Sequence, residues 1–89
     1  MFVSYGAETT RAYTAQELRD ALSALADASR FGMVLRAKGI VAGQDGAWLH
    51  FDYVPGESDV RSGAADITGR ICVIGSQLRE DALAEVFNL

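Results

Sequence analysis

Hydrophobic and polar residues alternate along three stretches of this chain, a two-residue period that is typical of β-strands with one buried face. The stretches run from Phe2 to about Thr9, from Val34 to Ala42 and from Ala47 to Val54. Gly, Gln and Asp separate the last two stretches, and this composition predicts a tight turn. The three stretches therefore predict one strand near the N-terminus and a later β-hairpin.

The length of the hairpin loop determines which residues share a face. A three-residue loop, Gln44–Gly46, gives a core face that is apolar throughout, whereas a four-residue loop sets Lys38 beside Phe51. A shift of one residue inverts every side chain, so we expect the three-residue loop. The pairs that it predicts are Val41 with Leu49, Gly39 with Phe51, Ala37 with Tyr53, Lys38 with Asp52 and Ile40 with His50.

Two segments have the spacing of amphipathic helices. Thr14 followed by Glu17 is a capping box, and apolar residues then recur at helical spacing as far as Ala26, so the first helix should end near Ala28–Ser29. Gly32 is placed to reverse the chain. The second helix runs from about Arg79 to Phe87, and its buried stripe is Leu83, Val86 and Phe87.

Two further strands are predicted between the hairpin and the last helix. Pro55–Asp59 is expected to be a loop, and Val60–Ala65 a weak strand at the edge of the sheet. Arg70–Ile74 is nearly continuous in apolar character, which favours a central strand that is covered on both faces or a strand in a thin sheet. Cys72 in this strand is then expected to be a buried structural thiol.

This order of elements predicts an α+β fold. Consecutive hairpins favour antiparallel pairing, and two amphipathic helices need a sheet face to cover. We expect a two-layer sandwich, with a mostly antiparallel sheet of about four to five strands and both helices on one face. The other face is expected to stay exposed, or to meet a second domain or subunit.

Composition limits the classes of partner. The chain of 89 residues is long enough for one domain, residues 1–89, and its net charge of −4 argues against nonspecific binding to nucleic acid or to an anionic membrane. A single cysteine excludes an internal disulfide and fits a reducing, cytoplasmic setting. The chain has no apolar run long enough to span a membrane. Because Met1 leads straight into a strand, we expect an excised domain of a longer protein, the alternative being a naturally short protein that lost its partner domain.

The residues show no constellation that specifies catalysis. The phosphate-binding motif Gly-x-x-x-x-Gly-Lys-Ser/Thr is absent, and Lys38 is the only lysine. His50 and Asp52 share a strand face and could provide two metal ligands or a small enzymatic site, but no second base or nucleophile accompanies them. The carboxylates in the predicted loops are expected to be solvated. These are Asp45, Glu57, Asp59 and Asp66.

The stretch around Arg36 and Lys38 admits two interpretations. It is a solvated strand face, with a cation paired to Asp52, or it is a contact surface for a partner, to which the neighbouring Trp48 would contribute. The candidate contact residues are Arg36, Lys38, Trp48, His50 and Asp52. Gly39 in the same strand predicts a close approach, either by Phe51 of the paired strand or by a helix above it.

The residue identities in this stretch are more specific than its alternation of polar and apolar positions. The specific motifs are Leu-Arg-Ala-Lys-Gly-Ile-Val at 35–41, Trp-Leu-His-Phe at 48–51 and the late pair Ile74–Gly75 with Leu78. In these motifs the chain resembles the C-terminal domain of the CobW-type GTPases, and the resemblance extends from about Arg11 to Leu89. Ala12 and Thr14 depart from the Pro and Asp that often precede the first helix in that family. Arg79 departs from its usual acidic or polar start of the last helix.

The resemblance implies a non-catalytic accessory domain. GTP, Mg²⁺ and a transition metal, zinc or cobalt, would bind to the separate P-loop GTPase domain of the parent protein, whose pathway is linked to cobalamin or zinc. The implied partners are that GTPase domain and a client protein that receives the metal. The resemblance assigns no catalytic, cofactor-binding or metal-binding residue to this chain. The alternative is a structural module that self-associates through Val60–Ala65 or through an uncovered sheet face.

Overall fold

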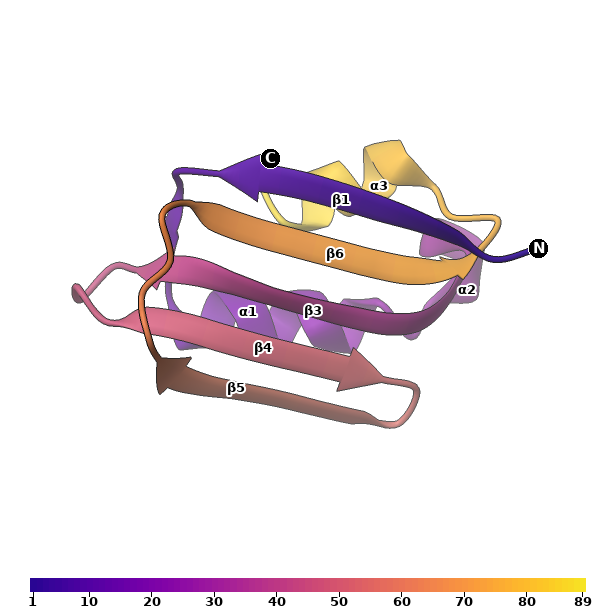
Figure 1. Ribbon diagram of the computed structural model, residues 1–89. Coiled ribbons are helices and arrows are strands. Elements are labelled where there is room, and N and C mark those ends of the chain that lie inside the picture. The colour runs from indigo at the N-terminus through magenta and orange to yellow at the C-terminus, as the bar shows by residue number, and fades with distance from the viewer.

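The computed structural model describes residues 1–89, in which six strands form one sheet and three helices cover it (Figure 1). Five of the strands lie in the order β1-β6-β3-β4-β5 and are antiparallel to their neighbours, while the short β2 pairs in parallel with β3. The elements are β1 (Val3–Thr9), β2 (Ala12–Tyr13), α1 (Ala15–Ala24), α2 (Ala28–Phe31), β3 (Met33–Gly43), β4 (Trp48–Val54), β5 (Glu57–Gly63), β6 (Gly69–Ser76) and α3 (Glu80–Val86).

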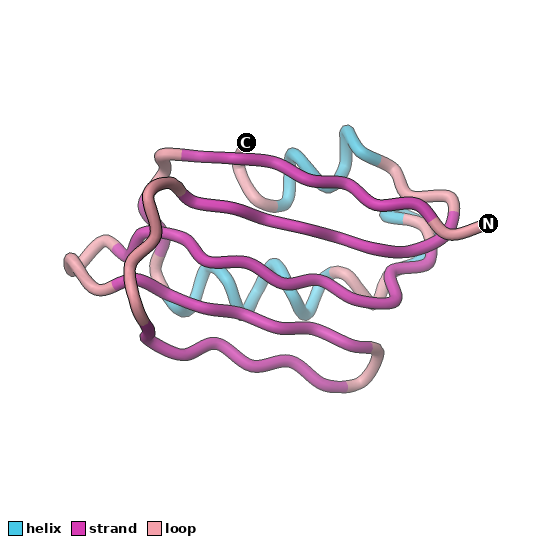
Figure 2. Tube along the Cα trace, in the orientation of Figure 1, coloured by secondary structure: helices cyan, strands magenta, loops and turns pink.

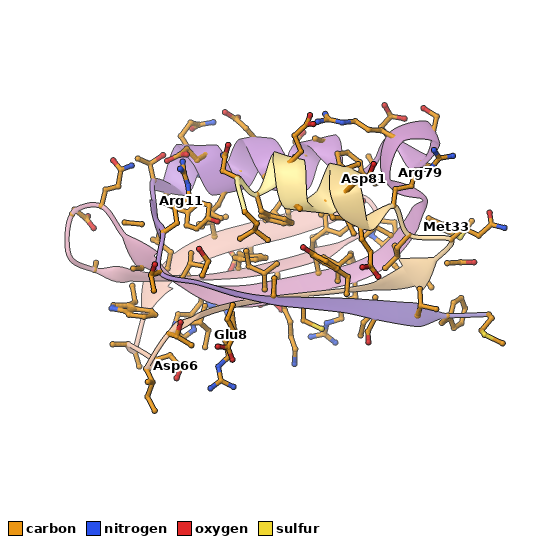
Figure 3. The ribbon with its side chains drawn as sticks, turned by 90° about the horizontal axis from the view of Figure 1, so that it is seen from above. Glu8, Arg11, Met33, Asp66, Arg79 and Asp81 are labelled. Carbon is orange, nitrogen blue, oxygen red and sulfur yellow. The ribbon has the colours of Figure 1, made fainter.

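The molecule has two layers. All three helices lie on one side of the sheet, α1 against β4 and β5, and α2 beside α3 and β3 (Figures 2 and 3). The predicted α+β sandwich with a mostly antiparallel sheet is therefore confirmed. The opposite side of the sheet, called the open face below, is covered by no helix. None of the helices is long and apolar enough to cross a membrane.

The predicted register of the β3–β4 hairpin is confirmed. Lys38 pairs with Asp52 and Ile40 with His50, and the three-residue loop is closed by a hydrogen bond of 2.8 Å from the Gly43 amide to the Ala47 carbonyl. Only the start of the second strand differs, because β4 begins at Trp48 rather than at Ala47.

The first helix begins as predicted but ends early. Thr14 accepts a hydrogen bond from the Glu17 amide, and the Glu17 carboxylate accepts one from the Thr14 amide, which completes the capping box. The helix stops at Ala24, so the prediction that it continues to Ala28–Ser29 and buries Ala26 was wrong. The side chain of Asp27 instead caps a separate four-residue helix, α2, by accepting from the Ser29 amide.

The strand after the hairpin was placed too late by the prediction. β5 spans Glu57–Gly63 and is joined to β4 by Pro55–Gly56 alone, so Pro55–Asp59 is not a loop. Gly56 has a φ of 85°, a left-handed conformation that glycine adopts without steric cost, and this permits the two-residue connection. Almost all of β5 is exposed, which explains why no apolar pattern marks its start.

A short element that the pattern did not predict links the two ends of the chain. The segment between β1 and α1 contains β2, and the buried Tyr13 in it donates a hydrogen bond from its hydroxyl to the Phe87 carbonyl after α3. The Phe87 ring stacks on Phe51 with centroids 5.8 Å apart. These contacts hold the last helix against the middle of the sheet. The largest fully buried side chains include Tyr13, Phe31, Phe51, Phe87, Leu18, Leu22, Leu25, Ile71 and Leu83.

Candidate functional site

The open face is built by strict alternation along the strands, with one exception. A β-bulge between Val34 and Arg36 lets both Val34 and Ala37 turn to the helices, and sends Arg36 to the open face. From there the register places Lys38 between Asp52 of β4 and Cys72 of β6. The same register brings the four neighbouring strands together over one area, where a cavity of about 480 Å³ lies.

This cavity, called the cationic cavity below, is lined mainly by polar and charged side chains. Arg36, Lys38, Arg61 and Arg70 line it together with Asp52 and Asp66. Four cations against two carboxylates give the lining a formal charge of +2, in a chain whose net charge is −4. The cavity is thus a local region of positive charge in an acidic protein.

Asp52 organises two of these cations. One of its carboxylate oxygens lies 3.6 Å from an Arg36 guanidinium nitrogen, and the other lies 3.1 Å from Arg61. Arg61 also donates to Asp59 at 2.8 Å, and the hydrogen bonds to Asp59 and then to Asp52 raise the pKa of its guanidinium. These groups are well exposed, so the pairs orient the side chains more than they stabilise the fold.

The remaining two cations are held less tightly. Arg70 lies 3.9 Å from Asp66, at the limit of an ion pair. Lys38 takes part in none of the ion pairs of the chain, although it faces Asp52 across the β3–β4 hairpin. Its ammonium group is exposed and is therefore free to bind a ligand or a partner.

His50 attaches the β5–β6 connection to the sheet. Its Nε2 atom lies 2.8 Å from the carbonyl oxygen of Ala64, and because a carbonyl only accepts, the Nε2–H of the ring donates. The structure brings no group of three or more His, Cys, Asp and Glu side chains together as metal ligands, so His50 and Asp52 have no third ligand beside them. The arrangement of His50 is that of a structural anchor.

Trp48 and Cys72 are placed differently from one another. Trp48 is half-buried on the open face beside Ala42 and Gly63, outside the lining of the cationic cavity. Cys72 is also half-buried and lines the cavity, so the prediction of a buried thiol was wrong. The reason is that β6 alternates between a buried and an open face and is covered only on the helix side.

Three charged residues of the cavity were not among the predicted contact residues. Arg61 lies on β5, Asp66 on the connection between β5 and β6, and Arg70 on β6. Figure 3 shows Asp66 and Glu8 on the side of the sheet away from the helices. The signal of the three cavity residues in the sequence is weak. The alternation Asp59-x-Arg61 indicates one polar strand face, but only the strand order shows that this face adjoins Lys38.

The floor of the cavity explains the glycine in β3. A Cβ atom at Gly39 would lie 2.5 Å from the Phe51 ring and 2.5 Å from the carbonyl oxygen of Arg70. The predicted approach of Phe51 is confirmed, and β6 approaches from the other side as well. Gly39 therefore allows Phe51 to fill the core beneath the cationic cavity.

A family model described as the cobalamin synthesis protein cobW C-terminal domain matches residues 2–88. The chain belongs to this family. The match begins at residue 2, nine residues earlier than Arg11, where the resemblance was predicted to start. No curated protein matches the chain.

Two solved structures have the same fold as this CobW C-terminal domain. One is a Zn(II)-bound triple mutant of the YjiA GTPase, with a TM-score of 0.78 and 21% identity. The other is the Zn(II)-bound YjiA GTPase from E. coli, with a TM-score of 0.73 and 22% identity. In both cases the match covers 98% of this chain and 29% of the YjiA chain, so the CobW C-terminal domain spans less than a third of the length of these GTPases.

Proposed function

We propose that this chain is the non-catalytic accessory domain of a CobW-like, GTP-dependent metal chaperone. Membership of the CobW C-terminal family supports this, together with the 29% share of the GTPase chains that it matches. The parent protein would bind GTP, Mg²⁺ and zinc or cobalt in its GTPase domain, and would deliver the metal in a cobalamin- or zinc-related pathway. This domain would couple the nucleotide state to recognition of a partner.

The observation that carries the proposal is the open face. The helices cover one side of the sheet and leave the other free. That free side presents Arg36 and Lys38 and, further along the same hairpin where β4 pairs with Ala42, the half-buried Trp48. Tryptophan and arginine are enriched where partners bury surface. We assign the docking of the GTPase domain to this face, with His50 and Asp52 supporting the contact residues.

The test is a calorimetric titration of this chain with the GTPase domain of its parent protein, in the presence of GTP and of GDP. We expect the affinity to depend on the nucleotide. The double variant Arg36→Ala, Lys38→Ala should raise the Kd by about tenfold or more, since charged groups at an interface contribute about 1.4 kcal/mol or more. Arg19→Ala, on the exposed side of α1, is the matched control and should bind like the wild type. Absence of binding in both nucleotide states contradicts the proposal.

Self-association is the alternative function. One of its two predicted surfaces, Val60–Ala65, falls largely on β5, an edge strand that carries Glu57, Asp59 and Arg61, and the other is the uncovered sheet face. Charged residues on an edge strand oppose pairing with a second copy, so this edge favours the accessory-domain proposal. Sedimentation over a wide concentration range separates the two, because a self-associating module gives a mass that rises with concentration.

A further inference from the structure

The charges of the cationic cavity are not balanced within the fold. Arg61 is tied to two carboxylates, but Arg36 lies 3.6 Å from its only partner, Arg70 lies 3.9 Å from Asp66, and Lys38 has none. Lys38 of β3 and Arg70 of β6 lie close together on the open face. Lys38 pairs with Cys72, and Arg70 is the next residue of β6 on the same face as Cys72. The lining alone has a formal excess of two positive charges, and one positive charge remains in excess when Asp59, which bonds Arg61 from outside the lining, is counted.

The surroundings of the cavity select for a small ligand. Glu8 faces Arg70 from β1, and Asp59 and Glu57 lie along β5 at the opposite side. A long polyanion laid across the sheet would meet these carboxylates, whereas a compact anion at the centre would not. The cavity of about 480 Å³ lies within the range of roughly 300–1,000 Å³ that is usual for small-molecule sites.

We propose that the cationic cavity binds a small dianion, either a phosphate group or a dicarboxylate, and that Lys38 and Arg70 make the principal contacts. Lys38 acts as a mobile point charge, and the planar guanidinium of Arg70 exchanges the distant Asp66 for the ligand. This site goes beyond the proposed function, because it requires neither the GTPase domain nor a nucleotide.

The test is an NMR titration of the whole chain with inorganic phosphate and, separately, with succinate. Ionic strength is held constant with NaCl, so that general screening does not change during the titration. We expect saturable shifts of the amide signals of Lys38, Ile40 and Cys72. Saturation by phosphate alone assigns the site to phosphate groups, and saturation by succinate alone assigns it to dicarboxylates. Shifts that stay linear and spread to Arg19 and Arg30 on the helix side overturn the proposal.

Two variants move the affinity in opposite directions. Lys38→Met removes the free ammonium from an exposed position and should weaken binding about tenfold, since a charged hydrogen bond is lost. Asp66→Asn releases Arg70 and should strengthen binding about two- to five-fold. Loss of fold would produce weakening only, so tightening by Asp66→Asn supports a real site. Unchanged affinity in Lys38→Met overturns it, and Arg19→Gln serves as the matched control.

The experiments can contradict the anion site and the proposed function independently of each other. Saturable dianion binding by this chain, without any binding of the GTPase domain, leaves the site in place and removes the accessory role. Nucleotide-dependent binding of the GTPase domain, without dianion saturation, does the reverse. The two titrations use different ligands and different readouts, so neither result decides the other.

Discussion

At the scale of single residues, Gly39 shows how a backbone position can be fixed from two sides. Any side chain there meets the Phe51 ring on one side and the Arg70 carbonyl oxygen on the other, each at 2.5 Å. An aromatic ring can shift by a few tenths of an ångström, but the carbonyl belongs to the β3–β6 ladder and cannot. The position thus constrains both the core and the strand pairing.

Gly39→Ala should lower the free energy of unfolding by about 1–3 kcal/mol, because overpacking forces either the ring or the strand to move. Gly6→Ala is the matched control. Gly6 lies in β1, where an added Cβ atom would meet no other atom within 4 Å, and it should tolerate alanine with little change. Urea unfolding of both variants measures the difference, and equal stabilities would show that the Gly39 contacts are easily relieved.

At the scale of elements, the capping box of α1 depends on an ionised glutamate. The backbone hydrogen bond from Thr14, followed by the hydrogen bond from Arg11 at 2.7 Å, lowers the pKa of the Glu17 carboxyl. A carboxyl with a lowered folded-state pKa stabilises the fold above its unfolded pKa. That contribution is lost as the pH falls through the folded-state value.

Glu17→Gln should therefore be less stable than the wild type by about 0.5 kcal/mol at pH 7. The difference should disappear as the pH falls below about 4.3, the ordinary pKa of glutamate, and then through the lower folded-state value. Urea unfolding across this range measures it. Glu57→Gln is the control, since Glu57 makes no ion pair. A difference that persists unchanged at acidic pH would contradict the electrostatic explanation.

Elements with a clear periodic pattern over several residues were predictable, whereas those that are very short or nearly free of apolar residues were not. The β3–β4 register followed from the alternation, because a slip would have buried Lys38. β5 was placed late because it buries almost nothing, and α2 was missed because four residues are too few for a periodic pattern. The run of apolar residues in β6 hid its alternation, since Cys72 and Ile74 lie on the open face.

At the scale of the whole molecule, Tyr13 joins segments that are 74 residues apart. Its hydroxyl donates to the Phe87 carbonyl in a buried setting, and burial raises the pKa of the phenol. The raised pKa means that this hydroxyl stabilises the fold below about pH 10, the ordinary pKa of tyrosine. The contribution is lost as the pH rises through the folded-state value, because the unfolded chain ionises first.

Tyr13→Phe should lower the free energy of unfolding by about 1–3 kcal/mol, since it leaves the Phe87 carbonyl without its partner. Tyr5→Phe is the matched control, because the half-buried Tyr5 makes no side-chain hydrogen bond. Thermal unfolding at neutral pH compares the two. If Tyr13→Phe is as stable as the control, the contact between β2 and the end of α3 contributes little to the fold.

The candidate site shows the limit of sequence reasoning at this scale. Arg36, Lys38 and Asp52 were placed on one face because they belong to a single hairpin whose register the alternation determines. Arg61 lies on β5, a hairpin partner of β4 whose start the sequence did not mark, and Arg70 lies on β6, which adjoins β3 only in the final strand order. No local pattern encodes that order, so the excess positive charge of the cavity became visible only in three dimensions.

The pairing of β1 with β6 has a consequence for synthesis on the ribosome. Within this domain, β1 is translated before the other strands and its only strand partner is Gly69–Ser76, so it stays unpaired while most of the domain is translated. Contacts between such distant segments are slow to form, because a long loop must close first. We expect the β3–β4 hairpin to form during translation, and the sheet to be completed only afterwards, when β6 enters between β3 and β1.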